Sequence, residues 1–275
     1  MSIFEAINDM FSYSFITRGV LVGGLVALCA SVLGVILVLK KYSMIGDGLS
    51  HVGFGAMAVG LAFNMAPLRA AIPIVILAAF LLLRISENSR IKGDSAIALI
   101  SSSSIAIGVI VNALSDGTNI DLNSYMFGSI LAISEDDMII CVVLGVAVLV
   151  LFLLFYNSIF AVTFDETFAK ATGVRVTVYK TMLSVLTAVT IVIGMRIMGT
   201  LLISSLIIFP ALSAMRVCRK FRTVMLMSVL ISICCFFVGM VASYMLEIPA
   251  GASIVVSNLA VFIIFFIIGK ISLAG

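Results

Sequence analysis

The hydrophobic positions of the chain form long runs, which short polar or charged segments separate. Several runs approach the roughly 20 apolar residues that a helix needs to cross a bilayer, and they lack the alternation that a membrane barrel strand requires. The pattern predicts an all-α, polytopic helical membrane protein with roughly eight to nine transmembrane helices. The expected spans cover 15–39, a second run that ends near Asn64, 67–84, 95–114, 138–156, a sixth that ends near Met195, 199–215, an eighth that ends near Met245, and 252–268.

Composition narrows the class of protein further. The chain of 275 residues is 63% hydrophobic but only 11% charged, whereas a soluble domain is about 25% charged. A net charge of +3 is small and fits basic loops near lipid headgroups, with no nucleic acid as a partner. The five cysteines fall mostly within apolar runs and form no CxxC pair, so neither a thiolate zinc site nor a disulfide framework is expected.

No composition shift or linker divides the chain, which predicts a single transmembrane domain over residues 1–275. Residues 1–15 mix polar and apolar positions, so they are expected to lie at the membrane interface and not to form a cleavable signal. The segment 122–133 is too short to span a bilayer and is expected to be re-entrant or interfacial. The serines at 101–104 are expected to hydrogen-bond within their own helix or to a neighbouring helix.

Lysine and arginine concentrate in alternate loops, which predicts the orientation. If the Lys40–Lys41 loop is cytoplasmic, the N-terminus lies outside and the C-terminus inside. The other basic segments that then fall on the cytoplasmic side are 84–93, 157–180, 216–222 and Lys270. The acidic stretch 115–137 lies outside. Its last three acids, 135–137, are expected either to collect cations or contact a binding protein, or to form a solvated helix start.

The segment 44–60, MIGDGLSHVGFGAMAVG, combines ionisable and very small residues. Asp47 and His51, the only histidine in the chain, are four residues apart and share one face of a helix. Ionisable groups within a membrane are costly and mark ion pathways by default. A carboxylate oxygen and an imidazole nitrogen suit Zn²⁺ or Mn²⁺. The alternative is a buried Asp–His hydrogen bond that holds two helices together.

This candidate metal site is sparse, because two ligands are fewer than the roughly four of a structural zinc site. A carrier that must release its cargo can use fewer ligands. Alternatively, two copies of the chain could bring four ligands around a two-fold axis. The glycines beside the pair would let a facing helix approach closely.

A second segment with chemical character lies between the expected fifth and sixth spans. Its core, 163–173, is expected to form a short amphipathic helix on the cytoplasmic side. The residues that favour this helix are the pair Phe164 and Phe168, the acids Asp165 and Glu166 in its first turn, and the candidate C-cap Gly173. Such a segment is either a solvated connection or a surface that a soluble partner grips.

Four segments, in this order and at this spacing, resemble the permease subunit of bacterial ABC importers for divalent transition metals, the zinc and manganese uptake family. They are MIGDGLSHVGFG at 44–55, SYMFGSILAIS at 124–134, FDETFAKATGV at 164–174 and GTLLISSLIIFPALSA at 199–214. The resemblance covers essentially the whole chain. It implies an ABC importer permease fold in the bacterial cell (inner) membrane. The implied complex has two permease copies, two cytoplasmic ATP-binding cassette subunits and an extracellular or periplasmic metal-binding protein.

The resemblance also implies roles for particular residues. Asp47 and His51 correspond to the intramembrane Asp and His that coordinate the metal in this family. The segment 164–173 corresponds to the coupling helix, which docks in a groove of the ATPase subunit. The residues expected to carry this coupling are Phe164, Asp165, Glu166, Phe168 and Gly173. The acidic outer loops are expected to face the binding protein.

The sequence departs from the family pattern at two places, and the second bears on the cargo. Where the family usually has Pro-Ala-Ala-Thr-Ala, this chain has Pro-Ala-Leu-Ser-Ala at 210–214, which keeps the proline bend but lacks the threonine. The manganese-type branch often has His-Ala-Val-Leu-Pro-Gly, whereas Val-Gly-Phe-Gly follows His51 here. The difference favours Zn²⁺ as the transported ion, with Mn²⁺ and Fe²⁺ as the other candidates. No permanently bound cofactor is expected.

The sequence contains no GxxxxGK[ST] phosphate-binding loop. The chain is therefore not expected to be an enzyme, and a partner subunit would hydrolyse the ATP. The main alternative is a secondary, ion-coupled divalent cation transporter with Asp47 and His51 as a proton-coupled site, which inverted repeats would favour. No clear second copy of GDGLSH is found in the other half of the sequence. A purely structural membrane scaffold is a third interpretation, and the ionisable pair argues against it.

Overall fold

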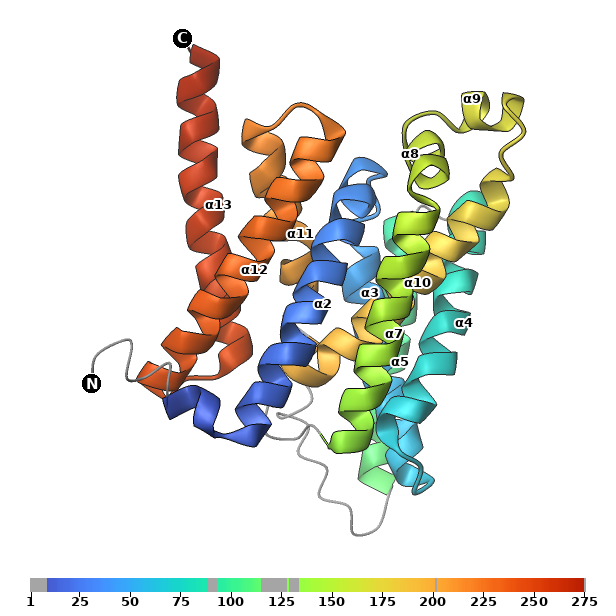
Figure 1. Ribbon diagram of the computed structural model, residues 1–275. Coiled ribbons are helices and arrows are strands. Elements are labelled where there is room, and N and C mark those ends of the chain that lie inside the picture. Colours follow the sequence, from blue (N-terminus) through green and yellow to red (C-terminus); the bar gives the residue numbers. More distant parts are fainter. Residues whose placement is uncertain (1–8, 89–92, 115–127, 129–133, 201, 275) are drawn as a thin grey trace.

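The structure is a computed structural model that describes residues 9–88, 93–114, 128, 134–200 and 202–274. Each regular element in these ranges is an α-helix (Figure 1), which confirms the predicted all-α class. In chain order, the helices are α2 (Ser14–Leu39), α3 (Ile45–Ala62), α4 (Pro67–Asn88), α5 (Gly93–Leu114), α7 (Glu135–Leu154), α8 (Tyr156–Phe164), α9 (Glu166–Ala171), α10 (Val176–Met198), α11 (Ile203–Val217), α12 (Phe221–Leu246) and α13 (Ala250–Ala274).

Seven of the described helices are long and apolar enough to cross a membrane, namely α2, α4, α5, α7, α10, α12 and α13. Two further bundle helices are shorter: α3 has 18 residues and carries an aspartate and a histidine, and α11 has 15 residues. At about 1.5 Å per residue, α11 is about 22 Å long, less than the roughly 30 Å of a hydrocarbon core. The predicted polytopic architecture is confirmed, and the two short helices are those that build the candidate metal site.

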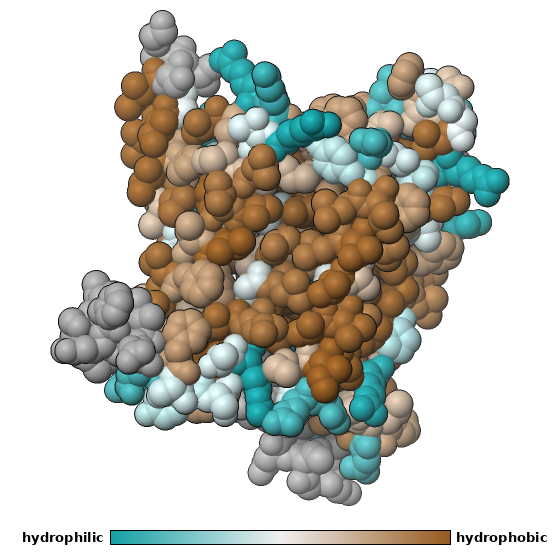
Figure 2. Space-filling model, in the orientation of Figure 1, coloured by the Kyte–Doolittle hydropathy of each residue, from teal (hydrophilic) through white to brown (hydrophobic). Residues whose placement is uncertain are grey.

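The face of the bundle shown in Figure 2 carries a broad hydrophobic belt with polar residues at both ends. Helix α2 is central and mostly buried, whereas α5, α7 and α13 are mostly exposed. Val143 and Leu153 on α7 and Ile264 on α13 are examples of large apolar side chains that these outer helices expose. A continuous apolar surface of this kind fits lipid hydrocarbon. The chain is therefore a multi-pass membrane protein.

Central helix α2 is joined to α12 and α11 by close contacts. The Ser228 and Ser232 hydroxyls of α12 donate to the carbonyl oxygens of Ser31 and Ala27 on α2, at 3.2 and 2.9 Å. Such interhelical hydrogen bonds supplement van der Waals packing where lipid gives no hydrophobic drive. On the side of α11, a Cβ on Gly34 would lie 2.0 Å from the carbonyl oxygen of Ile207, so only glycine fits there. These contacts fix α12 and α11 relative to the centre of the bundle.

One end of the bundle is rich in basic residues. Helix α2 ends there, α10 and α12 begin there, and the short α8 and α9 lie at the same end, the upper end in Figure 1. Basic residues at this end include Lys40, Lys41, Lys170, Arg175, Lys180, Arg216, Arg219, Lys220, Arg222 and Lys270. The arrangement agrees with the predicted orientation, in which this end faces the cytoplasm.

The opposite end holds the three acids at 135–137, which begin α7. The Ser134 hydroxyl caps this helix by accepting from the Asp137 backbone N–H at 3.1 Å. Each acid pairs with an arginine of another helix: Glu135 with Arg18 of α2, Asp136 with Arg69 of α4 at 4.0 Å, and Asp137 with Arg196 of α10 at 3.1 Å. Glu135 and Asp136 are exposed, as a solvated helix start requires, but Asp137 is mostly buried. The acids therefore tie α7 to its neighbours and do not form a free cation-collecting cluster.

Some predicted boundaries differ from the described helices. The sequence predicts the seventh span from residue 199, but α11 begins at Ile203, because Gly199 adopts a φ of 84° and ends α10. The predicted re-entrant segment 122–133 lies outside the described residues except for Gly128. Of the predicted interfacial segment, residues 1–8 are likewise outside. Met10 is buried in the hydrophobic core, so this part packs against the bundle and does not only rest at the interface.

Candidate functional site

The N-terminal part of α3 brings Asp47 and His51 together. His51 Nε2 lies 3.7 Å from Asp47 Oδ2, as the four-residue spacing on one helix face predicts. This distance is longer than a hydrogen bond, so the hydrogen-bonded pair considered as the alternative is not formed. The side chain of His51 is 15% exposed and that of Asp47 is 41% exposed. The pair therefore lies at the edge of the packed interior, with its carboxylate accessible.

Helix α11 adds a third polar group to this pair. Ser204 Oγ donates to Asp47 Oδ1 at 3.5 Å, although the two residues are 157 positions apart. Gly46 faces the same turn of α11, because a Cβ there would lie 3.4 Å from Ile207 Cδ1 and 3.9 Å from the Ser204 Cα. Ser204 is in the first turn of α11, so the positive end of that helix dipole also lies near the carboxylate.

A break between α10 and α11 allows both helices to contact α3. The Gly199 N–H donates to the Met195 carbonyl at 2.9 Å and closes α10, and its φ of 84° turns the chain before Ile203 starts α11. On the α10 side, a Cβ on Gly53 would lie 2.4 Å from Met195 Sδ. The small Gly53 thus admits a bulky side chain of α10 against α3, on a different face from Asp47 and His51.

Another face of α3 packs tightly on α5. A Cβ on Gly55 would lie 2.5 Å from the carbonyl oxygen of Ser104, so the two backbones are in direct contact. Farther along, Gly48 packs on Ile97 and near Ser101. The Ser101 hydroxyl is buried and makes no hydrogen bond within the described part of the chain, which contradicts the expectation for this serine. The close packing holds α3, and therefore Asp47, in a defined place.

The donor set of this site is small. The described residues contain no group of three or more His, Cys, Asp or Glu side chains that could hold a metal ion. One copy of the chain offers one carboxylate, one imidazole and one hydroxyl, from Asp47, His51 and Ser204. Oxygen and nitrogen donors of this kind match divalent transition metals, and a site short of ligands suits brief occupancy more than permanent binding.

The predicted amphipathic helix at 163–173 is two helices in the structure. Helix α8 ends at Phe164, and Asp165 is extended, with φ −148° and ψ 100°. The Asp165 side chain caps α9 by accepting from the Phe168 backbone N–H at 2.9 Å. Gly173 follows α9 with a φ of 84°, a conformation that glycine adopts without strain. Asp165 is therefore an N-cap residue and not part of the first turn, and the break separates Phe164 from Phe168.

The two phenylalanines have different surroundings. The Phe164 ring lies 4.8 Å from that of Phe160 and 5.6 Å, edge to face, from that of Phe221 at the start of α12. Phe164 thus packs within the chain, although 56% of it is exposed. Phe168 is 62% exposed, and no ring contact involves it among the described residues. Both side chains are therefore exposed, and they differ in that Phe164 has ring partners within the described part of the chain.

Glu166, the first residue of α9, bridges two lysines. Lys40 Nζ donates to Oε1 at 2.7 Å and Lys180 Nζ lies 2.6 Å from Oε2. Partial burial alone would raise the pKa of the Glu166 carboxyl, but the hydrogen bonds and charges of Lys180 and Lys40 outweigh it and lower the pKa below its usual value. Because the folded-state pKa is lowered, the pairing is intact at neutral pH and is lost only as the pH falls through that lowered pKa.

Four residues that the sequence did not single out take part in these arrangements: Ser204, Lys40, Lys180 and Phe221. Ser204 lies within the motif at 199–214 but has no feature that distinguishes it from Ser205. The two lysines serve in the sequence only as orientation signals. Their positive charge is the only feature of the sequence that suggests a pairing with Glu166. Every other lysine and arginine expected on the cytoplasmic side has the same charge.

A bundle of apolar helices with an Asp–His pair on a short interior helix is the arrangement expected of a membrane transport protein. The sequence profile of the ABC 3 transport family matches residues 12–269. The chain therefore belongs to the ABC 3 transport family.

Proteins similar to this chain include named transport subunits. The manganese import system permease protein ScaB of Streptococcus parasanguinis is 30% identical over 264 residues, which cover 96% of this chain and 94% of ScaB. The high-affinity zinc uptake system membrane protein ZnuB of Haemophilus influenzae is 27% identical over 252 residues, covering 92% of this chain and 97% of ZnuB. The solved structure of PsaBC from Streptococcus pneumoniae in complex with Fab matches with a TM-score of 0.86 and 30% identity, over 96% of this chain and 95% of that chain.

Proposed function

We propose that this chain is the membrane-spanning permease subunit of an ATP-driven importer that translocates divalent transition metal ions delivered by an external binding protein. The observation that carries the proposal is the Asp47–His51 pair on the short interior helix α3 of an ABC 3 family chain. Ser204 of α11 adds a hydroxyl beside Asp47. The partly exposed carboxylate supports a transit site, because a cargo that must leave needs an open side. The names of the similar manganese and zinc proteins support the same class of cargo.

Two copies of the chain would complete the metal site. One copy supplies fewer than the roughly four ligands of a closed zinc site, and the 41% exposure of the Asp47 side chain leaves that carboxylate accessible from outside its own chain. A two-fold axis passing close to this face would bring the Asp47–His51 pair of each copy together and give two carboxylates and two imidazoles. We therefore propose a permease homodimer.

The energy for transport would come from two copies of a cytoplasmic ATP-binding cassette subunit, since the chain has no phosphate-binding loop of its own. Phe168, on the exposed side of α9, is proposed as the main contact with this subunit. Gly173 would end the docking helix, and Asp165 would start it through its cap. ATP binding and hydrolysis would then change which side of the membrane the site faces.

The cargo is proposed to be Zn²⁺ or Mn²⁺, with Fe²⁺ as a further candidate. The imidazole nitrogen favours Zn²⁺, whereas the carboxylate and hydroxyl oxygens also suit Mn²⁺, so the donor set fits both ions. The sequence Val-Gly-Phe-Gly after His51 favours zinc, and the names of several similar proteins specify manganese.

Reconstitution of the complete importer in vesicles tests this proposal. With the cognate binding protein and ATP present, Zn²⁺ or Mn²⁺ should stimulate ATP hydrolysis and accumulate in the vesicles, whereas Mg²⁺ should do neither. Vesicles that contain a complex whose ATPase subunit cannot hydrolyse ATP should accumulate no metal. Uptake that persists in that complex would contradict the proposal and favour an ion-coupled transporter.

The different surroundings of the two phenylalanines predict a split between their variants. Phe168→Ala should weaken co-purification of the ATPase subunit, because an exposed aromatic anchor is typically worth about 2 kcal/mol or more at an interface. Phe164→Ala should leave that binding largely intact and lower the thermal stability of the permease, because it removes ring contacts with Phe160 and Phe221. Equal loss of the ATPase subunit in both variants would contradict the separation of their roles.

Ser204→Ala should weaken metal transport without abolishing it. The variant loses one hydrogen bond to a carboxylate, worth about 1.5–3 kcal/mol at ideal geometry, and the 3.5 Å length places the effect at the low end, roughly a tenfold rise in apparent KM for the metal. Ser205→Ala is the matched control, since the Ser205 hydroxyl donates to Leu202 O within its own helix start at 2.6 Å. The same rise in KM for both variants would remove Ser204 from the site.

A further inference from the structure

Glu166 connects three separate parts of the chain. Its two carboxylate oxygens bind Lys40, which directly follows α2, and Lys180, which belongs to α10. The Lys40 side chain is only 7% exposed, and a lysine so enclosed is costly to leave without its partner. The bridge therefore joins the start of α9 to the end of α2 through a contact whose lysine end is enclosed and whose carboxylate end is 43% exposed.

Lys40 begins the short connector that leads into the metal-site helix. The connector comprises residues 40–44, between the end of α2 and the start of α3 at Ile45. It reverses direction through Lys41, whose φ is 61°, while the Tyr42 N–H donates to the Leu37 carbonyl at 2.8 Å and closes α2. A shift of Lys40 is thus passed through only a few residues to Ile45, which is two positions before Asp47.

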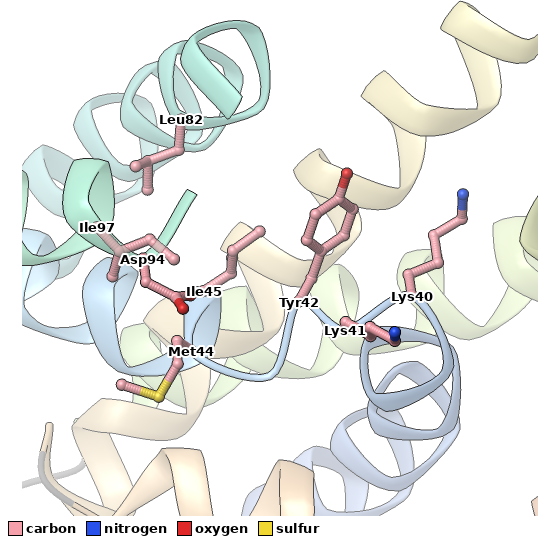
Figure 3. A pocket seen from close by; sticks show the side chains of 8 residues that line it. All are labelled: Lys40, Lys41, Tyr42, Met44, Ile45, Leu82, Asp94 and Ile97. Carbon is pink, nitrogen blue, oxygen red and sulfur yellow. The ribbon is translucent and has the colours of Figure 1, made fainter. Parts of the chain in front are cut away.

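Cavities border this connector on two sides. The larger one, of about 190 Å³, is lined by residues 40–42, Met44 and Ile45, with Leu82, Asp94 and Ile97 of α4 and α5 across from them (Figure 3). A smaller one, of about 20 Å³, lies toward α10 and shares Lys40, Tyr42 and Ile45 with the first. Close-packed interiors resist displacement, so the open space around the connector lets it move without disturbing the core of the bundle.

We propose that Glu166 is a positioning residue that links α9 to the 40–44 connector, so that a movement of α9 shifts the start of α3 and its Asp47–His51 pair. The proposal rests on the proposed docking of the ATPase subunit on α9. Phe164 supplies a second attachment, because its contact with Phe221 joins the end of α8 to α12. The α8–α9 segment then acts on the bundle at two places, and Glu166 is the one directed toward the metal site.

Direct binding of Glu166 to the ATPase subunit fits the geometry less well. Both carboxylate oxygens are already held, at 2.7 and 2.6 Å, by lysines of the permease itself. A cation of the partner would have to share this carboxylate with the two lysines, and the like charges would repel one another. The exposed side chain of Phe168 offers a contact that requires no such exchange.

Glu166→Gln and Lys40→Gln, each in the full importer complex, test the link. Both variants should keep the ATPase subunit bound and its ATP hydrolysis within about twofold of wild type, and they should lower metal uptake per ATP by roughly tenfold or more, within the usual range of coupling between sites. The double variant should transport no less metal per ATP than the more severe single variant, because both single substitutions break the same Lys40–Glu166 bridge. Lys270→Gln, an exposed charge at the same end on α13, is the matched control and should transport normally.

A second measurement does not depend on transport. Hydrogen exchange of residues 40–47 should change when wild-type complex binds a non-hydrolysable ATP analogue, and this change should be absent in Glu166→Gln. Loss of the ATPase subunit from Glu166→Gln, uptake per ATP within about twofold of wild type, or an unchanged exchange response would each overturn the link. Failure of the wild-type complex to transport Zn²⁺, Mn²⁺ or Fe²⁺ would instead overturn the proposed function, and the exchange experiment would still report on the link.

Discussion

Asp47→Asn should reduce ATP-driven metal uptake to the background of empty vesicles. The substitution keeps the size of the side chain and an oxygen that can accept from Ser204, but it removes the negative charge that offsets the charge of a divalent cation. His51→Gln should have a similar effect, because it removes the single imidazole nitrogen. A lost ligand in a site with so few donors leaves too little to replace the hydration shell of the ion. Uptake of radioactive zinc or manganese into vesicles measures the effect.

A control variant should remove a charge that lies outside the candidate metal site. Glu247→Gln alters an exposed glutamate at the end of α12 and should transport as wild type does. Both site variants should still assemble with the ATPase subunit, since neither residue lies near α9 in the sequence or in the described helix contacts. Uptake above one tenth of wild type in Asp47→Asn would contradict the assignment, because loss of a charged metal ligand should cost more than about 1.4 kcal/mol.

The sequence predicts best what depends on neighbouring residues. The Asp47–His51 arrangement follows from a four-residue spacing on a helix, and the structure brings the two groups within 3.7 Å. Apolar run lengths likewise predict the seven long helices. Local spacing cannot predict that Ser204 reaches Asp47 across 157 residues, or that Lys40 reaches Glu166 across 126. These contacts depend on how whole helices pack, which a single sequence with nearly uniform apolar faces does not specify.

At the break between α8 and α9, two local features of the sequence compete, a helical spacing of phenylalanines and an N-cap aspartate. Phe164 and Phe168 have the spacing of one helix face, which favours a continuous helix. Asp165 is among the preferred N-cap residues, and its side chain accepts from the N–H three positions later. The cap decides the outcome, so Phe164 turns toward Phe221 and Phe168 toward the surface. The same choice frees Glu166 to start α9 beside the two lysines.

The position of α11 depends on a glycine of α2, which gives the second large expected effect. A Cβ on Gly34 would lie 2.0 Å from the Ile207 carbonyl oxygen and 3.3 Å from its Cγ2. Backbone cannot rotate aside as a flexible side chain can, so Gly34→Ala must separate α2 from α11. Overpacking of this kind costs about 1–3 kcal/mol, and thermal unfolding of the detergent-solubilised permease should show a lowered Tm.

Gly24→Ala, on the same helix, is the matched control for this variant. No atom lies within 4 Å of a Cβ built there, so alanine adds no clash and removes the entropic cost of a glycine within a helix, about 0.5–1 kcal/mol. The two variants should therefore shift the Tm in opposite directions. Because α11 also carries Ser204 beside Asp47, Gly34→Ala should raise the apparent KM for the metal, whereas Gly24→Ala should not. Equal Tm values for the two variants would show that α2 and α11 do not pack as closely as this contact requires.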